Sequence, residues 1–181
     1  MGTRHKTLKD GERQVINFLF PGDFIGMQAA IMGEMKHSVE ATTNMVLCVF
    51  HRPDIWTLFK SFPERAYDLT WIAAVEEHFL GETIAILGQR DAGQRIACAF
   101  LRVFQRLRGV DLGEPDHVPL PFRQQDLADA LGLSLVHTNK ILARLREMGF
   151  ARWTDGLLAI PDLGRLADYA GLDPSRWSAA P

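Results

Sequence analysis

The chain has few of the features that mark secreted, membrane or metal-binding proteins. Its 181 residues include two cysteines, Cys48 and Cys98, which lie in separate apolar stretches and form no Cys-x-x-Cys pair. We therefore expect two buried free thiols rather than a disulfide or a metal site. No apolar run approaches the roughly 18 residues of a membrane helix, and residues 1–10 contain no signal-peptide core. These absences predict a cytoplasmic protein without a membrane partner.

A strong net charge and catalytic motifs are also lacking. The net charge of −2 differs from the strongly basic character of a dedicated non-specific nucleic-acid binder. We find no paired carboxylates, Ser/His/Asp arrangement, phosphate-cradling glycine loop or metal-ligand spacing, and the six histidines are scattered. His78, near Glu77 and Glu82, is typical of a solvated helix face rather than a metal site. The sequence therefore predicts neither an enzyme nor a metal-binding protein.

Residues 124–146 have the spacing of a helix-turn-helix. Ala128 is small enough to let two helices approach closely, Gly132 supplies a tight turn, and Ser134 is placed to cap a second helix. At about 100° per residue, one side of that second helix forms an apolar stripe predicted to be buried, made of Thr138, Ile141, Leu142, Leu145 and Met148. Taken alone, such a pair of helices is also common in ordinary α-rich domains.

A predicted hairpin after the two helices favours DNA binding. Two short apolar runs, 150–153 and 157–160, flank Asp155-Gly156, a pair of residues that favours a tight hairpin turn. Helix, turn, helix and hairpin is the order of a winged helix, whose second helix can lie in a DNA major groove. Residues 121–150 carry four basic and three acidic side chains. We therefore expect modest non-specific affinity and tight binding only by a dimer.

A long helix is predicted before this segment, beginning at Pro63 and ending near Gly88. Its apolar residues form two overlapping stripes, which can cover a barrel on one side and the same helix of a partner on the other. The predicted dimerisation residues are Leu69, Ile72, Ala73, Phe79, Leu80, Ile84 and Leu87. The alternative is that the second stripe packs only within the monomer.

The rest of the chain predicts an α+β protein. Residues 5–50 have the β-branched and aromatic runs and the turns of an antiparallel barrel or jelly roll, with a strand at 13–20 and either one long strand or a strand pair at 39–50. Helices are expected at 53–59 and 94–107, and a loop at 109–121. We predict a partial β-roll effector domain (1–62), a dimerisation helix (63–88) and a winged helix-turn-helix domain (89–181), with a frayed tail at 174–181.

Three segments resemble the CRP/FNR superfamily of bacterial transcription regulators: FLFPGDFIG (18–26), GQRDAGQRIACAFL (88–101) and FRQQDLADALGLSLVHTNKILARLREMGFARW (122–153). The resemblance covers essentially the whole chain. It implies an effector-responsive homodimer that binds a palindromic operator and contacts RNA polymerase. The comparison with the family pattern also predicts that the first strands of the roll are missing, and we therefore expect an N-terminally short member. Such an incomplete roll is expected to expose strand edges and apolar surface.

The resemblance also singles out effector-pocket candidates, which are Gly26, Met27, His37 and Ser38. Members that bind cyclic nucleotide have a glutamate at the position of Met27 and an arginine at that of His37. Methionine is a poor hydrogen-bond acceptor, and a mostly neutral histidine cannot replace a guanidinium on phosphate. The sequence thus argues against cyclic AMP, and the lack of a cysteine-rich N-terminal stretch argues against an iron-sulfur cluster. The effector stays unidentified.

In the DNA reader, the family's base-contacting positions correspond to Leu135, Val136, Asn139 and Lys140. Val136 could contact a thymine methyl group, Asn139 suits adenine, and Lys140 suits guanine or phosphate. Many relatives have a glutamate at 136, so their half-site should not be transferred to this protein. Further candidates for contact with DNA, chiefly with phosphates, are Arg123, Gln124, Gln125, Ser134 and Arg144, and His137 could either pack or touch the backbone.

Two hypotheses follow. The first is a dimeric, sequence-specific transcription regulator that responds to an unidentified effector. The alternative is a truncated module that dimerises or binds an effector and carries a weak or vestigial DNA reader. The first is the leading hypothesis, although the weak local basicity and the missing strands lend slight support to the alternative.

Overall fold

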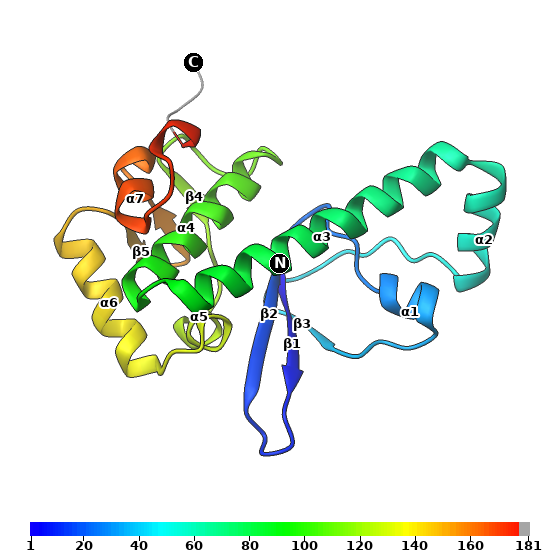
Figure 1. Ribbon diagram of the computed structural model, residues 1–181, viewed down its shortest axis with the longest axis horizontal. Helices are drawn as coiled ribbons and strands as arrows, with labels where there is room; N and C mark the ends of the chain where they lie inside the picture. The colour runs from blue at the N-terminus through cyan, green and yellow to red at the C-terminus, as the bar shows by residue number, and fades with distance from the viewer. Residues whose placement is uncertain (178–181) are drawn as a thin grey trace.

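The computed structural model describes residues 1–177, and it consists of two lobes connected by one long helix (Figure 1). The connecting helix is α3 (Pro63–Gln89), and the first lobe contains a small sheet together with α1 (Met27–Met32) and α2 (Arg52–Ser61). The second lobe contains α4 (Ala92–Arg108) and all later elements. The combination of helices and antiparallel sheets confirms the predicted α+β class. No helix within these residues combines the length and apolar character needed to cross a membrane.

The sheet of the first lobe has three antiparallel strands. They are β1 (Gly2–Thr7), β2 (Arg13–Leu19) and β3 (Ser38–Ala41), in the spatial order β2-β1-β3. A turn joins the first two strands, and in it the Leu8 N–H donates to the Glu12 carbonyl and the Gly11 N–H donates to the Leu8 carbonyl. Along β2 every second side chain is buried, including Val15 and Leu19, because successive side chains of a strand point to opposite faces. Strand β2 therefore has one face against the rest of the protein.

The strand predicted at 39–50 is wrong beyond Ala41. Residues 44–50 form no regular element, and the Val46 side chain is 99% exposed. Their apolar run is typical of a strand, but a strand also needs a neighbour to bond its backbone, and no neighbouring strand pairs with this segment among the described residues. Cys48 lies here and is exposed, so the expectation of a buried thiol is wrong for it and confirmed for Cys98.

The second lobe is a winged helix around α4. Its remaining elements are β4 (His117–Pro119), α5 (Gln124–Leu131), α6 (Leu135–Glu147), β5 (Arg152–Thr154), β6 (Leu157–Ala159), α7 (Leu163–Ala170) and a 3-10 turn (Pro174–Arg176). Helix α4 begins at Asp91, whose side chain accepts a hydrogen bond from the Gln94 backbone in a capping box. Its apolar residues, Phe100 and Leu101 among them, are buried at the centre of the core. The break predicted between α3 and α4 is confirmed.

Two expectations for the second lobe are wrong. The predicted loop at 109–121 contains β4, which pairs with β6 and completes a three-stranded sheet in the order β4-β6-β5. The predicted frayed tail begins with an ordered turn, and Trp177 packs against the core. Residues 178–181 of that tail lie outside the described residues. Helix α7 packs on α4 and has no counterpart among the predicted elements.

Candidate DNA-reading surface

The turn between α5 and α6 has the geometry that its sequence predicts. Gly132 has a φ of 63°, which glycine adopts without strain, and it ends α5. Ala128 is fully buried, so the two helices approach closely at this point. The Ser134 hydroxyl accepts a hydrogen bond of 3.2 Å from the His137 backbone N–H and caps α6. These features fix the direction in which α6 leaves the domain.

One side of α6 is buried, and the buried residues are those of the predicted stripe. Thr138, Ile141 and Leu145 are buried, and Leu142 and Met148 are half-buried. These residues join the core that also contains α4 and α5. The burial of this stripe fixes which side of α6 remains available to a ligand.

The opposite side of α6 is uncovered near its N-terminus. Val136 is 81% exposed, and His137, Asn139 and Lys140 are exposed as well. Leu135, at the first position, is 38% exposed. Within residues 1–177, the Asn139 amide and the Lys140 ammonium form no hydrogen bond or ion pair with another side chain. Their donors and acceptors are therefore available to base edges or phosphates.

The wing beside α6 is a tight hairpin. Asp155 and Gly156 have positive φ values of 53° and 73°, as a two-residue hairpin turn requires. Trp153 on β5 donates its indole N–H to the Leu120 carbonyl at 2.9 Å and packs edge-on against Phe100 of α4. The predicted hairpin is confirmed, and these contacts fasten it to the core.

Comparisons with known proteins agree with this geometry. Residues 3–62 match the cyclic nucleotide-binding domain, and residues 94–169 match the Crp-like helix-turn-helix domain. The chain is 29% identical to the nitrogen fixation regulation protein FixK of Bradyrhizobium diazoefficiens over 92% of this chain and 69% of that protein. It is 27% identical to the transcriptional activator protein FnrL of Cereibacter sphaeroides over 96% of this chain and 71% of that protein.

The fold of the whole chain is also found in a solved structure. FixK2 from Bradyrhizobium japonicum superposes with a TM-score of 0.82 and 24% identity, over 99% of this chain and 84% of that chain. The chain belongs to the CRP/FNR family of transcription regulators. Family membership confirms the predicted resemblance, and because these relatives are transcription regulators, it also agrees with the prediction that the protein is not an enzyme.

Two of the three predicted phosphate-contacting residues at the start of α5 already have partners inside this CRP/FNR protein. Arg123 donates from its backbone N–H and from its guanidinium to the Asp126 carboxylate, at 2.9 to 3.2 Å. Gln125 donates to the Asp129 carboxylate. Gln124 is exposed, as is Arg144 on α6. A phosphate contact by Arg123 would therefore share the guanidinium with Asp126.

Asp126 also joins the reader to the first lobe. The Arg13 guanidinium on β2 donates to its carboxylate at 2.9 Å, and the neighbouring Gln14 amide donates to the Asp129 carbonyl at 2.7 Å. Asp126 is only 1% exposed. Burial raises the pKa of Asp126, but the hydrogen bonds from Arg123 and Arg13 outweigh that effect and hold the pKa below its ordinary value. This contact was not predicted from the sequence, although an acid at the third position of a helix is itself a capping signal.

The seven predicted dimerisation residues divide into two groups along α3. Leu69 and Ala73 line a cavity with Ile55 of α2, and Phe79 and Leu87 face α4. Ile72 is half-buried, whereas Leu80 is 40% exposed and Ile84 is 70% exposed. Of the seven predicted residues, Leu80 and Ile84 are therefore the most available to a partner.

The four effector-pocket candidates do not meet in one cavity. Gly26, with a φ of 90°, and Met27 lie at the start of α1, and Ser38 begins β3. His37 is half-buried, and its Nε2 has no hydrogen-bond partner. Burial is the main cause that lowers the pKa of His37, and the positive charge of the nearby Arg4 lowers it further.

Within residues 1–177, no three His, Cys, Asp or Glu side chains are grouped so that they could hold a metal ion.

Proposed function

We propose that the protein is a homodimeric, effector-responsive transcription regulator that acts in the cytoplasm and reads a palindromic operator through α6. The observation that carries this proposal is the uncovered N-terminal half of α6 beside an ordered wing. An exposed and well-capped reading helix supports an active reader over a vestigial one. As in other family members, RNA polymerase is the proposed protein partner.

The exposed side chains of α6 suit specific base recognition. Asn139 can bond adenine through both its donor and its acceptor, and Lys140 can donate to guanine or to a phosphate. Val136 gains nothing from the protein core, but in a groove it can contact a thymine methyl group. We therefore propose that these three residues specify the half-site, with Leu135 beside them. Ser134, His137 and Arg144 are placed to contact the backbone of the DNA.

The substitution Ile84→Glu is expected to convert the dimer to a monomer. Ile84 is 70% exposed on the proposed interface, and two buried glutamates facing each other across a two-fold axis would repel. Light scattering at micromolar concentration should show half the wild-type mass. Trp71→Glu is the matched control, since Trp71 is 60% exposed on the opposite side of α3. Dimers of Ile84→Glu, together with monomers of Trp71→Glu, would assign the interface to the other face.

Selection from a random pool of duplexes is expected to enrich a palindrome. A two-fold symmetric dimer presents its two reading helices to half-sites about one helical turn, roughly 10 base pairs, apart. The experiment uses the full chain at about 100 mM salt, followed by sequencing of the retained DNA. If a protein shown to be dimeric enriches no sequence, the proposal of a sequence-specific reader is refuted and the vestigial alternative stands.

Cyclic AMP is expected not to bind. The methyl thioether of Met27 is a weak acceptor for a ribose hydroxyl, and His37, whose pKa is lowered by burial, is neutral at pH 7 and cannot compensate a phosphate. Calorimetric titration with cyclic AMP should give no saturable heat. Saturable binding at micromolar nucleotide would contradict this account.

We likewise propose that this chain holds no iron-sulfur cluster, because a cluster is usually held by four cysteines and the chain has two.

A further inference from the structure

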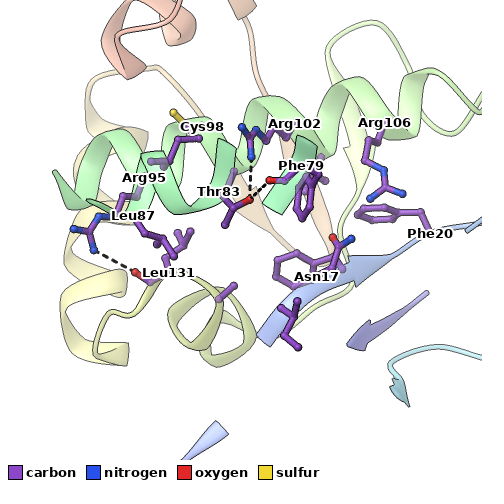
Figure 2. Close-up of a pocket in the computed structure, with 16 residues that line it drawn as sticks. Asn17, Phe20, Phe79, Thr83, Leu87, Arg95, Cys98, Arg102, Arg106 and Leu131 are labelled. Carbon is purple, nitrogen blue, oxygen red and sulfur yellow. Dashed lines mark hydrogen bonds between the residues drawn. The ribbon is translucent and has the colours of Figure 1, made fainter. Parts of the chain in front are cut away.

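A small pocket lies where the two lobes meet (Figure 2). Its walls come from β2, the C-terminal part of α3, α4 and the end of α5. Most of the lining is apolar, with Phe20, Phe79, Leu87 and Leu131 among the contributors. None of the predicted effector residues lines this pocket. A molecule bound here would touch the first lobe, the long helix and the DNA reader at once.

An amide side chain lines this pocket. Asn17 on β2 is only 6% exposed, and its side chain lies between the rings of Phe20 and Phe79 (Figure 2). Within residues 1–177, the Asn17 amide forms no hydrogen bond with another group. The amide atoms are not among the fully buried polar atoms that lack a partner, so they remain accessible from the pocket. The Asn17 amide can therefore donate to and accept from a polar group in the pocket.

Three arginines of α4 also line the pocket, in positions that share one side of the helix. Arg106 is paired with Asp23, and Arg102 donates to Glu82 at 3.3 Å and to the Thr83 hydroxyl at 3.2 Å. Arg95 differs from both, because it donates only to the backbone carbonyls of Arg90 and Leu131. No carboxylate in the described residues pairs with Arg95. The pocket therefore has an excess positive charge.

We propose that this pocket binds a small amphipathic carboxylate. The apolar body would lie among the phenylalanine and leucine side chains, Arg95 would pair with the carboxylate, and Asn17 would bond a polar group of the ligand. Apolar walls with a few convergent polar groups are typical of small-molecule sites. Because the pocket connects both lobes, occupancy would fix the position of the DNA reader relative to the long helix. This regulatory consequence, unlike binding itself, rests on the proposed function.

The test measures binding to the full chain without DNA, by calorimetry, so that it is independent of the DNA reader. Octanoate supplies both a carboxylate and an apolar chain, 1-octanol lacks the charge, and acetate lacks the chain. We expect saturable binding of octanoate, with 1-octanol and acetate each weaker by about tenfold or more. Equal binding of octanoate and 1-octanol, or no saturable binding of octanoate, would overturn the proposal, even if the selection of DNA succeeds.

Variants locate the site. Arg95→Gln should weaken octanoate binding by about tenfold, because it removes the positive charge that pairs with the carboxylate. Arg108→Gln is the matched control, because Arg108 lies on the same helix outside the pocket and donates to the Gly113 carbonyl. Circular dichroism checks that each variant is folded. Full octanoate binding by a folded Arg95→Gln variant would place the ligand elsewhere.

Discussion

Replacing Asp126 by alanine is expected to lower the free energy of unfolding by about 3 kcal/mol. The Asp126 carboxylate is buried and accepts hydrogen bonds from both Arg123 and Arg13. Without it, the Arg13 guanidinium, whose side chain is 20% exposed, keeps the Thr3 hydroxyl at 3.0 Å. The carboxylates that remain near it are Asp129 at 3.9 Å and the half-exposed Glu40 at 3.5 Å. The loss should be measured by urea unfolding, followed by tryptophan fluorescence.

Glu147→Ala provides the control for this substitution. Glu147 is exposed at the end of α6 and forms no ion pair in the described residues, so its loss should change the stability by less than about 0.5 kcal/mol. If the two variants were equally stable, the contact between Asp126 and the arginines would not contribute to the fold. A double-mutant cycle tests whether Arg13 and Asp126 act as a pair. If they do, Arg13→Ala lowers the free energy of unfolding of the wild type but causes no additional loss in the Asp126→Ala variant.

The stabilisation by Asp126 should also depend on pH. Its folded pKa lies below the ordinary value of 3.8, so the unfolded chain binds more protons in the window between the two pKa values. The contribution is therefore fully present above pH 3.8 and is lost as the pH falls through the folded pKa. Asp126→Asn should flatten the dependence of stability on pH in that window.

The DNA reader could be predicted from the sequence because its signals are local. The cap at Ser134, the turn at Gly132 and the hairpin at Asp155-Gly156 each depend on residues within a few positions. The buried stripe of α6 follows from helical periodicity alone. Capping, turn and periodicity signals among neighbouring residues thus define both the elements and the uncovered side of the reading helix.

Contacts between distant segments could not be predicted in the same way. Arg13 and Asp126 are 113 residues apart, and nothing in either local sequence specifies the other. Residues 44–50 look like a strand, but pairing with a neighbour decides whether a strand forms. Periodicity identified the apolar sides of α3 without showing that Leu69 packs beside α2 and that Ile84 is exposed. The arginines of the pocket have a helical spacing that could have been noticed, but the pocket itself depends on the packing of the two lobes.

The double variant Asn139→Ala/Lys140→Ala is expected to bind its operator at least about 100-fold more weakly than the wild type. Each base contact contributes about 1 to 3 kcal/mol of discrimination, and a dimer makes each contact twice. Both residues are exposed and unpaired within the described chain, so the thermal stability should not change. Fluorescence anisotropy with the selected operator and with a scrambled duplex measures the specific and the non-specific affinity.

The ratio of these two affinities tests most directly whether α6 reads DNA sequence. Asn44→Ala/Lys60→Ala removes the same two side-chain types from exposed positions in the other lobe, and it controls for the change in charge. We predict that the ratio collapses towards one in Asn139→Ala/Lys140→Ala and is retained in the control variant. A wild-type ratio in a folded Asn139→Ala/Lys140→Ala dimer would contradict the assignment of α6 as the reading helix.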